Sequence, residues 1–320
     1  MLNILFVTFP FFALVLAGYL AARRRILPLE AIPGLNGFVL FFALPCMLYR
    51  FGSTTPIAQL LDVTAASVYL LCALIMVGFA IAWTMSHRVR WNDASLGALV
   101  AAFPNSGFMG VPLLVALLGP AAAGPVILTI LVDMVITSSL CVALSRLDGA
   151  EGHGRAAMID AGKKALRGVF ANPMPWAILL GAVASYMQFR LPAPVEKTAW
   201  LLADAASPVA LFTIGAVLAR SHIQAGQPMS IGDYLPVALM KLLLHPLLIL
   251  VLGAAVRQMG LPLDPFALTV MVLVAALPSA SNVSLLAERL GADNGRIARI
   301  ILVTTVAAFF TFSAVVSLLT

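Results

Sequence analysis

Charged side chains are scarce in this sequence. Asp, Glu, Lys and Arg make up 10% of the 320 residues, whereas 62% are hydrophobic and the mean hydropathy is +1.04. Because a soluble domain has about 25% charged residues, this composition excludes a soluble enzyme, a disordered chain and a nucleic-acid-binding module. The formal net charge of +6 is then explained best by basic loops on the cytoplasmic face of a membrane protein.

Cysteine is also rare, and the motifs of common catalytic sites are missing. Cys46, Cys72 and Cys141 each lie in an apolar run, without the spacing of a metal site or a disulfide framework. The sequence has no G-x-x-x-x-G-K-[ST] nucleotide loop, no G-x-S-x-G nucleophile elbow and no H-E-x-x-H among its four histidines. We therefore expect no metal site, no cofactor, no catalytic residues and no ATP-hydrolysing site within this chain.

Long apolar segments dominate what is present. A bilayer core requires about 20 apolar residues per helix. Ten segments meet this need, and they predict an all-α polytopic membrane protein with ten transmembrane helices. The segments are Leu2–Ala22, Leu35–Gly52, Val63–Met85, Ala94–Leu118, Ala121–Ser145, Pro173–Phe189, Thr198–Ala219, Tyr234–Val256, Pro265–Glu288 and Arg296–Leu319.

The basic residues predict the orientation of these spans. Fourteen Lys and Arg residues fall in odd-numbered loops and four in even-numbered loops, while Lys241 lies inside a span. Cytoplasmic loops are rich in Lys and Arg, so we expect the odd loops in the cytoplasm and both termini outside. Arg23, Arg24 and Arg25 follow the first apolar segment, which is the reverse of a cleavable signal peptide. We therefore expect this segment to remain as a span.

The sequence also predicts an internal repeat. Ala43–Gly52 and Ala206–Gly215 both read A-x-P-x-x-L-aromatic-x-x-G, and Ala101–Ser106 and Ala275–Ala280 both begin A-A-x-P. Each half holds five spans, so the second half must enter the membrane in the opposite sense. An inverted 5+5 repeat of this kind is typical of secondary transporters. We expect residues 1–150 as the first repeat, 151–172 as a cytoplasmic linker and 173–320 as the second repeat, within one membrane domain.

The fourth and ninth spans each carry a proline near the middle. Pro104 and Pro278 remove a backbone donor and clash with the preceding turn, and small or polar residues follow both. We expect two broken helices whose half-helix N-termini face the membrane midplane and favour an anion. Alternatively, these residues only bend the helices or allow close packing. The candidate substrate-binding residues are Pro104, Asn105, Ser106, Gly107, Pro278, Ser279, Ser281 and Asn282.

Ionisable residues within spans are a further signal of function. Asp133 lies in the middle of the fifth span, and Lys241 and His245 lie four residues apart on one face of the eighth. We consider these three residues candidates for coupling transport to a proton. The alternatives are a structural ion pair for Asp133, a Lys241 side chain that extends to the membrane surface, and a neutral packing role for His245. Pro45 and Pro208 are expected to kink helices near the site.

At these residues the sequence resembles the auxin efflux carrier family of bacterial and plant transporters. The resemblance covers the whole chain, and its most specific segment is Pro104–Leu114. It is also carried by Ala43-Leu-Pro, Ser207-Pro-Val-Ala-Leu-Phe, Lys241-Leu-Leu-Leu-His-Pro246 and Ala276-Leu-Pro-Ser-Ala-Ser-Asn282. The short central loop is similar to the bacterial members, and among these to the malonate carriers.

The resemblance implies that broken helices 4 and 9 cross at Pro104 and Pro278. It also implies a substrate site beside this crossing and an elevator-like motion of a transport domain against a scaffold. Asn105 would follow the first crossing proline, whereas after the second proline Ser279 comes first and the asparagine only at position 282. How these side chains meet a ligand therefore stays open.

The sequence predicts a secondary active transporter of a small organic anion, with malonate or a related dicarboxylate as the first candidate. Alternatives are a passive anion channel or facilitator, export of an auxin-like aromatic carboxylate, an intramembrane enzyme, and a membrane scaffold or sensor. A proton or sodium ion could be coupled to transport. We expect a multi-pass protein of the bacterial cytoplasmic membrane, in contact with lipid, that can form a homodimer and binds no nucleic acid.

Overall fold

A computed structural model describes residues 2–56, 60, 62–85, 89–146, 163, 167, 170–224 and 229–320. Within these ranges the ordered elements are helices, and the extended pairing is a single antiparallel bridge between Pro104 and Ser279. The predicted linker 151–172 lies largely outside the described residues.

All ten predicted apolar segments are helical in the described ranges. Uninterrupted α-helices are α1 (Leu2–Arg23), α5 (Val63–Thr84), α11 (Pro173–Tyr186), α12 (Ala193–Gln224) and α17 (Asn294–Leu319). Three further helices are continuous but contain a π turn in the middle. The first consists of α2 (Ile32–Phe38), the π turn η2 (Val39–Ala43) and α3 (Leu44–Thr54), and the second of α8 (Ala123–Val132), the π turn η5 (Asp133–Thr137) and α9 (Ser138–Ser145). The third consists of α13 (Leu235–Leu239), the π turn η8 (Met240–Leu244) and α14 (His245–Gln258).

The fourth and ninth predicted spans are interrupted. The fourth consists of α6 (Trp91–Ala102), the π turn η3 (Ser106–Gly110) and α7 (Val111–Leu118), and the ninth of α15 (Pro265–Ala276) and α16 (Asn282–Arg289). Seven helices of the described chain are long and apolar enough to cross a membrane, while Ser106–Leu118, Pro173–Tyr186 and Pro265–Ala276 are shorter apolar helices. The chain is thus a polytopic membrane protein, and the count of ten crossings stays a prediction.

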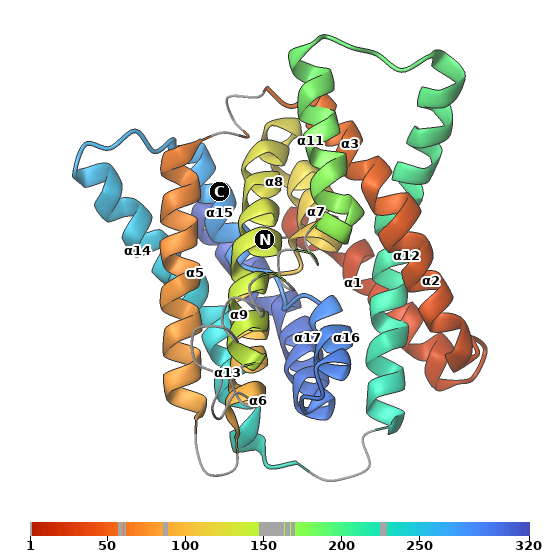
Figure 1. The fold of residues 1–320 in the computed structure, drawn as a ribbon, viewed down its shortest axis with the longest axis vertical. Helices are drawn as coiled ribbons and strands as arrows, with labels where there is room; N and C mark the ends of the chain where they lie inside the picture. The colour runs from red at the N-terminus through yellow and green to blue at the C-terminus, as the bar shows by residue number, and fades with distance from the viewer. Residues whose placement is uncertain are drawn as a thin grey trace.

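The helices form two groups (Figure 1). In the first group α1 packs along α12, and α3 packs against both α11 and α12. The second group contains α5, α6, α8, α9 and α13 to α17, with α5 against α6 and α14 against α15. Contacts of α1 and α12 with α17, and of α12 with η3, join the two groups. We refer to them as the α1–α12 bundle and the crossing bundle.

Glycines bring helices of the α1–α12 bundle into backbone contact. A Cβ atom at Gly18 or Gly215 would collide with the backbone of Phe212 or Val15, so α1 and α12 touch directly. A Cβ atom at Gly52 would lie 3.3 Å from Cα of Gly181, so α3 and α11 approach in the same way. Small residues commonly allow such close packing in membranes. The two pairs of glycines have the same spacing in the sequence, since 181 − 18 and 215 − 52 are both 163, as the predicted repeat would give.

The outer surface of the helices is apolar. Large hydrophobic side chains such as Phe6, Leu16, Trp83, Leu180 and Phe310 are exposed. A soluble monomer rarely exposes extensive apolar patches, so this surface fits contact with lipid. The buried polar side chains include several at the interrupted helices and the π turns, namely Asn105, Ser106, Asp133, Thr137, Lys241, Ser279 and Ser281.

Candidate substrate site at the helix crossing

Both helix breaks begin shortly before a proline. α6 ends at Ala102 and α15 at Ala276, and the next residues, Phe103 and Leu277, are extended. A proline clashes with the helical conformation of the residue before it, so the chain leaves the helix at these points. Within a membrane, the backbone groups freed in this way need partners inside the protein.

Each break supplies partners for the other. The Asn105 amide donates to the Pro278 carbonyl at 2.8 Å, and the Ala280 amide donates to the Phe103 carbonyl at 3.0 Å. Pro104 and Ser279 face each other in the resulting antiparallel bridge. The two breaks that the sequence predicts therefore meet and pair at their prolines.

Two polar groups at the crossing are buried and have no protein partner among the described residues. These are the Ser279 hydroxyl and the Asn282 side-chain oxygen Oδ1, while Asn105 is only 4% exposed and Ser106 is fully buried. The Ser279 amide has a partner, because it donates to the Thr304 hydroxyl at 3.3 Å. Buried polar groups are normally hydrogen-bonded, so the unpaired ones are available to a ligand or to water.

A small cavity of about 30 Å³ adjoins the crossing. It is lined by four predicted site residues in a row, Pro104–Gly107, and by Asn282. This volume is close to that of one water molecule, so the crossing is nearly closed in this conformation. Pro278, Ser279 and Ser281 belong to the crossing but do not line this cavity. Leu44 does line it, next to Pro45, whereas the side chain of Pro208 is exposed on α12.

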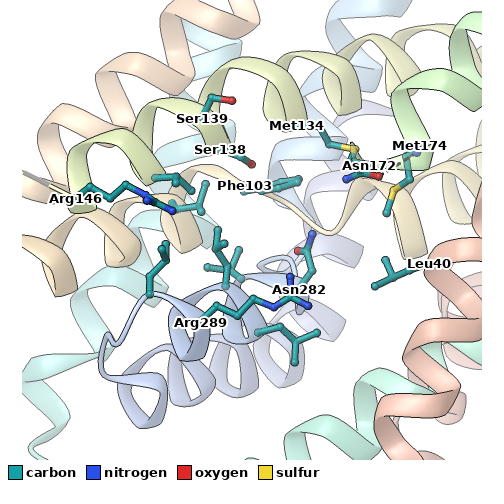
Figure 2. Close-up of a pocket in the computed structure, with 16 residues that line it drawn as sticks. Leu40, Phe103, Met134, Ser138, Ser139, Arg146, Asn172, Met174, Asn282 and Arg289 are labelled. Atoms are coloured by element: carbon teal, nitrogen blue, oxygen red, sulfur yellow. Dashed lines mark hydrogen bonds between the residues drawn. The ribbon is translucent and has the colours of Figure 1, made fainter. Parts of the chain in front are cut away.

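A larger cavity of about 470 Å³ lies beside the small one. The two share Phe103, Met134, Met174 and Asn282 in their walls, so the larger cavity leads up to the crossing. Figure 2 shows Arg146 at the end of this cavity away from Met174 and Leu40, and Arg289 between them, close to Asn282. The cavity is large enough for a small organic molecule.

The three predicted coupling residues are buried in the crossing bundle. Asp133 is the first residue of η5 and is fully buried. Its carboxylate accepts hydrogen bonds from the Tyr69 hydroxyl on α5 at 2.7 Å and from the Thr137 hydroxyl at 3.1 Å. A buried carboxylate is costly unless it is hydrogen-bonded or paired, and these two hydroxyls reduce that cost.

Lys241 and His245 lie together, as their spacing predicts. The Lys241 ammonium is 3.2 Å from Nδ1 of His245 and donates to the Ala275 carbonyl at 2.6 Å. The alternative in which Lys241 extends to the membrane surface is wrong, because this side chain is fully buried. Ala275 lies in the last turn of α15, whose carbonyls lack helical partners. Lys241 thus ties the buried cluster to the end of the helix that precedes Pro278.

The cluster is electrostatically connected across the bundle. Asp133 and Lys241 attract each other, although no direct ion pair joins them in the described structure. His245 Nε2 is buried and lacks a partner there, and its ring lies 6.2 Å from the ring of Tyr69. The cluster thus contains one carboxylic acid, Asp133, and two basic side chains, Lys241 and His245, all fully buried.

Some residues of the site were not predicted from the sequence. Tyr69 lies in an apolar run 64 residues before Asp133, and only the packing of α5 on η5 reveals their contact. Thr137 could have been found, because it follows Asp133 by four residues on one helical face. Arg146 and Arg289 were counted only as loop charges. Within the described residues, no group of three or more His, Cys, Asp or Glu side chains could hold a metal ion.

Comparison with known proteins gives one family over nearly the whole chain. The family described as "Membrane transport protein" matches residues 4–316. A "Putative malonate transporter" of Rhizobium meliloti is 31% identical over 315 residues, which cover 97% of this chain and 94% of the relative. The "Uncharacterized transporter YfdV" of Escherichia coli K12 is 27% identical, with coverage of 88% and 86%. "Auxin efflux carrier component 8" of Arabidopsis thaliana is 23% identical, with coverage of 85% of each chain.

Proposed function

Because this chain belongs to the membrane transport protein family, which includes auxin efflux carriers, we propose that it is a secondary transporter of a small organic anion. The observation that carries this proposal is the pairing of two polar helix breaks, with unpaired buried side chains next to a cavity. Malonate or a related dicarboxylate is the first candidate substrate, since a relative over 97% of the chain is described as a malonate transporter.

The crossing offers hydrogen-bond donors for a carboxylate. The side chains of Asn105, Ser106 and Asn282 surround or adjoin the small cavity, and half-helices begin at η3 and α16. Amide and hydroxyl donors satisfy the oxygens of an anion, and the N-terminal ends of helices favour negative charge. None of the residues that line the small cavity is charged. The site can therefore release an anion as well as bind it.

Alternating access would follow from the two helix bundles. The larger cavity connects one side of the protein with the crossing, while the crossing itself is nearly filled. A movement of the crossing bundle against the α1–α12 bundle would expose the same residues to the other side. Transporters with inverted repeats and interrupted helices commonly work by such movements of one bundle against another. We include the ten crossings and the inverted repeat in this proposal.

The buried cluster supplies a route for coupling to a proton. Protonation of Asp133 would remove the charge that Lys241 faces, and Lys241 is bonded to the last turn of α15 next to the crossing. Inward movement of an anion costs about 2.3 kcal/mol per charge at 100 mV, inside negative. Uptake of a dianion would therefore require a coupled cation, whereas export could use the potential alone. A proton suits this cluster better than sodium, because the Lys241 side chain already supplies the positive charge near Asp133 that a sodium ion would supply.

Two other functions make different predictions for transport assays. A passive channel or facilitator would show flux that does not saturate and no counterflow. An exporter of aromatic carboxylates would prefer an auxin-like substrate over malonate. We further propose a homodimer in the bacterial cytoplasmic membrane, with odd loops in the cytoplasm and both termini outside. In that orientation the larger cavity opens toward the cytoplasm.

The proposal is tested by uptake and counterflow of labelled malonate in proteoliposomes. We expect saturable flux and counterflow for the wild type, and loss of both for Asn105→Ala. Absence of malonate flux together with saturable flux of another carboxylate would correct the substrate. Flux without saturation and without counterflow would overturn the carrier and favour the channel.

A further inference from the structure

Two of the helical walls of the larger cavity each end in an arginine. One wall is formed by residues of η5 and α9 and ends at Arg146, which follows the last turn of α9. The other is formed by α16 and ends at Arg289, the last residue of that helix. Figure 2 shows both side chains extending into the same space from these two helices. Two helices far apart in sequence thus bring two guanidinium groups to one cavity.

The charge in this cavity has one sign. Its lining contains Arg146 and Arg289 but no Asp or Glu, and the remaining polar groups are hydroxyls and amides. The described structure shows no ion pair for either arginine. A cleft lined by charges of one sign and bounded by apolar walls concentrates ions of the opposite sign. The guanidinium group also matches a carboxylate with two parallel hydrogen bonds.

One face of α16 connects Arg289 with the crossing. On α16, Asn282, Leu285, Leu286 and Arg289 all line the cavity. These positions are three or four residues apart and therefore share one helical face. Asn282 and Arg289 are separated by seven residues, or about 10 Å along the helix axis. An anion held by the arginines is therefore one short step from the side chain of Asn282, whose amide Nδ2 can donate to a carboxylate, and from the neighbouring crossing donors.

We propose that Arg146 and Arg289 form a carboxylate-recruiting site that receives the substrate before it reaches the crossing. This inference rests on the proposed function and adds two residues that would select a dicarboxylate over a monocarboxylate. The two cations in the larger cavity attract a dianion more strongly than a monoanion, whereas the donors at the crossing are uncharged. The arginines therefore act as specificity residues on one face of the protein.

A purely structural role for the arginines makes a different prediction. Both lie at the C-terminal end of a helix, where a cation stabilises the helix dipole. In that case replacement would lower the melting temperature and leave the apparent KM unchanged. The apparent KM on each face of the membrane therefore separates the two roles.

The experiment measures malonate and acetate transport in vesicles of zwitterionic phosphatidylcholine. This lipid removes anionic headgroups, which could otherwise occupy the arginines. The variants are Arg146→Gln, Arg289→Gln, the double variant and Arg289→Lys, each with substrate presented on one face at a time. Arg220→Gln is the matched control, because Arg220 lies toward the C-terminal end of α12, on the cytoplasmic side in the proposed orientation, but lines neither cavity.

We expect the double variant to raise the apparent KM for malonate about tenfold on the arginine face, with little change in the maximal rate. The rise should be smaller for acetate, smaller at high salt and absent on the opposite face. Arg289→Lys should restore part of the affinity, and Arg220→Gln should behave as wild type. An unchanged KM for malonate on the arginine face, in a wild type that transports it, would overturn the recruiting site and leave the proposed function standing. A wild type that transports no carboxylate would overturn both.

Discussion

The Asn105 amide and the Pro278 carbonyl are joined by a hydrogen bond of 2.8 Å, although 173 residues separate them in the sequence. Each proline breaks its own helix, and the backbone groups released by one break are satisfied by the other. The crossing is therefore stable without a continuous helix. It leaves the adjacent side chains, Asn105 and Asn282, free to serve a ligand.

Replacement of Asn282 by alanine should weaken substrate binding without destabilising the protein. A hydrogen bond to a charged group contributes about 1.5–3 kcal/mol, which corresponds to roughly a tenfold or larger increase in Kd. The Asn282 oxygen is buried without a partner in the described structure, which lowers the stability of the folded protein. Removal of this oxygen should therefore not destabilise the protein. The measurements are the apparent KM for malonate and the melting temperature in detergent.

Asn36→Ala is the control for this prediction. Asn36 lies on α2 and lines neither cavity at the crossing. An unchanged KM in Asn282→Ala, or an equal increase in both variants, would remove Asn282 from the binding site.

Asp133→Asn should separate exchange from proton-driven accumulation. Asparagine preserves the shape of the side chain and can bond to Tyr69 and Thr137, but it cannot take up a proton. We therefore expect accumulation of malonate driven by a pH gradient to be lost, while counterflow continues and no longer depends on pH between about 5 and 8. Labelled malonate in proteoliposomes measures both processes.

The matched control replaces an exposed carboxylate. Asp204 lies on α12, outside the buried cluster, and its carboxylate pairs with Arg50 at 2.6 Å. Asp204→Asn removes this carboxylate. This variant should accumulate malonate as the wild type does. Normal accumulation by Asp133→Asn would show that the coupled ion binds elsewhere.

Lys241→Met should destabilise the protein. The substitution leaves the Ala275 carbonyl without its donor and Asp133 without the nearby positive charge. Removal of one member of a buried charged pair costs about 3–5 kcal/mol. We expect a value near the lower end, because Asp133 and Lys241 are not in direct contact. Urea or thermal unfolding in detergent measures the loss.

A second substitution tests the electrostatic part of this cost. The double variant Asp133→Asn with Lys241→Met should recover part of the lost stability, since it removes both buried charges. Lys197→Met, at an exposed position of α12, should have little effect. Additive losses in the double variant would contradict an interaction between Asp133 and Lys241.

Gly215→Ala should destabilise the contact between α1 and α12. The new Cβ atom would collide with the backbone of Val15, which cannot rotate away as a side chain can. Overpacking of this kind typically costs about 1–3 kcal/mol. Thermal unfolding in detergent measures the effect.

Gly78→Ala is the control for overpacking. Gly78 lies within α5, and a Cβ atom there would meet nothing within 4 Å. Alanine is favoured over glycine in a helix, so this variant should be as stable as the wild type or more stable. Equal melting temperatures for the wild type and Gly215→Ala would refute the close helix contact.

Local chemistry explains why much of the crossing could be predicted. Pro104 and Pro278 are each followed by small or polar residues, so the sequence alone locates both breaks to within a few residues, whereas Pro208 lies inside the continuous helix α12. The ends of other helices were harder to predict. α12 extends from Ala193 to Gln224, beyond the predicted Thr198–Ala219, because hydropathy delimits an apolar stretch and polar residues continue the helix at both ends.

Long-range packing explains what the sequence could not provide. Tyr69 is an aromatic residue in an apolar run, and nothing nearby distinguishes it from a core residue. Its hydroxyl belongs to the buried cluster only because α5 places it 2.7 Å from the Asp133 carboxylate, to which it donates a hydrogen bond. Likewise, Arg146 and Arg289 line one cavity only because α9 and α16 come together.

The glycine contacts limit how the protein can move. Where Gly18 and Gly215 bring α1 against α12, and Gly52 and Gly181 bring α3 against α11, main chain touches main chain. No layer of side chains remains between these helices to change rotamer, so sliding of one past the other would force backbone atoms into collision. The α1–α12 bundle is thus resistant to shear. In the proposed transport movement, large displacements would therefore occur at its boundary with the crossing bundle.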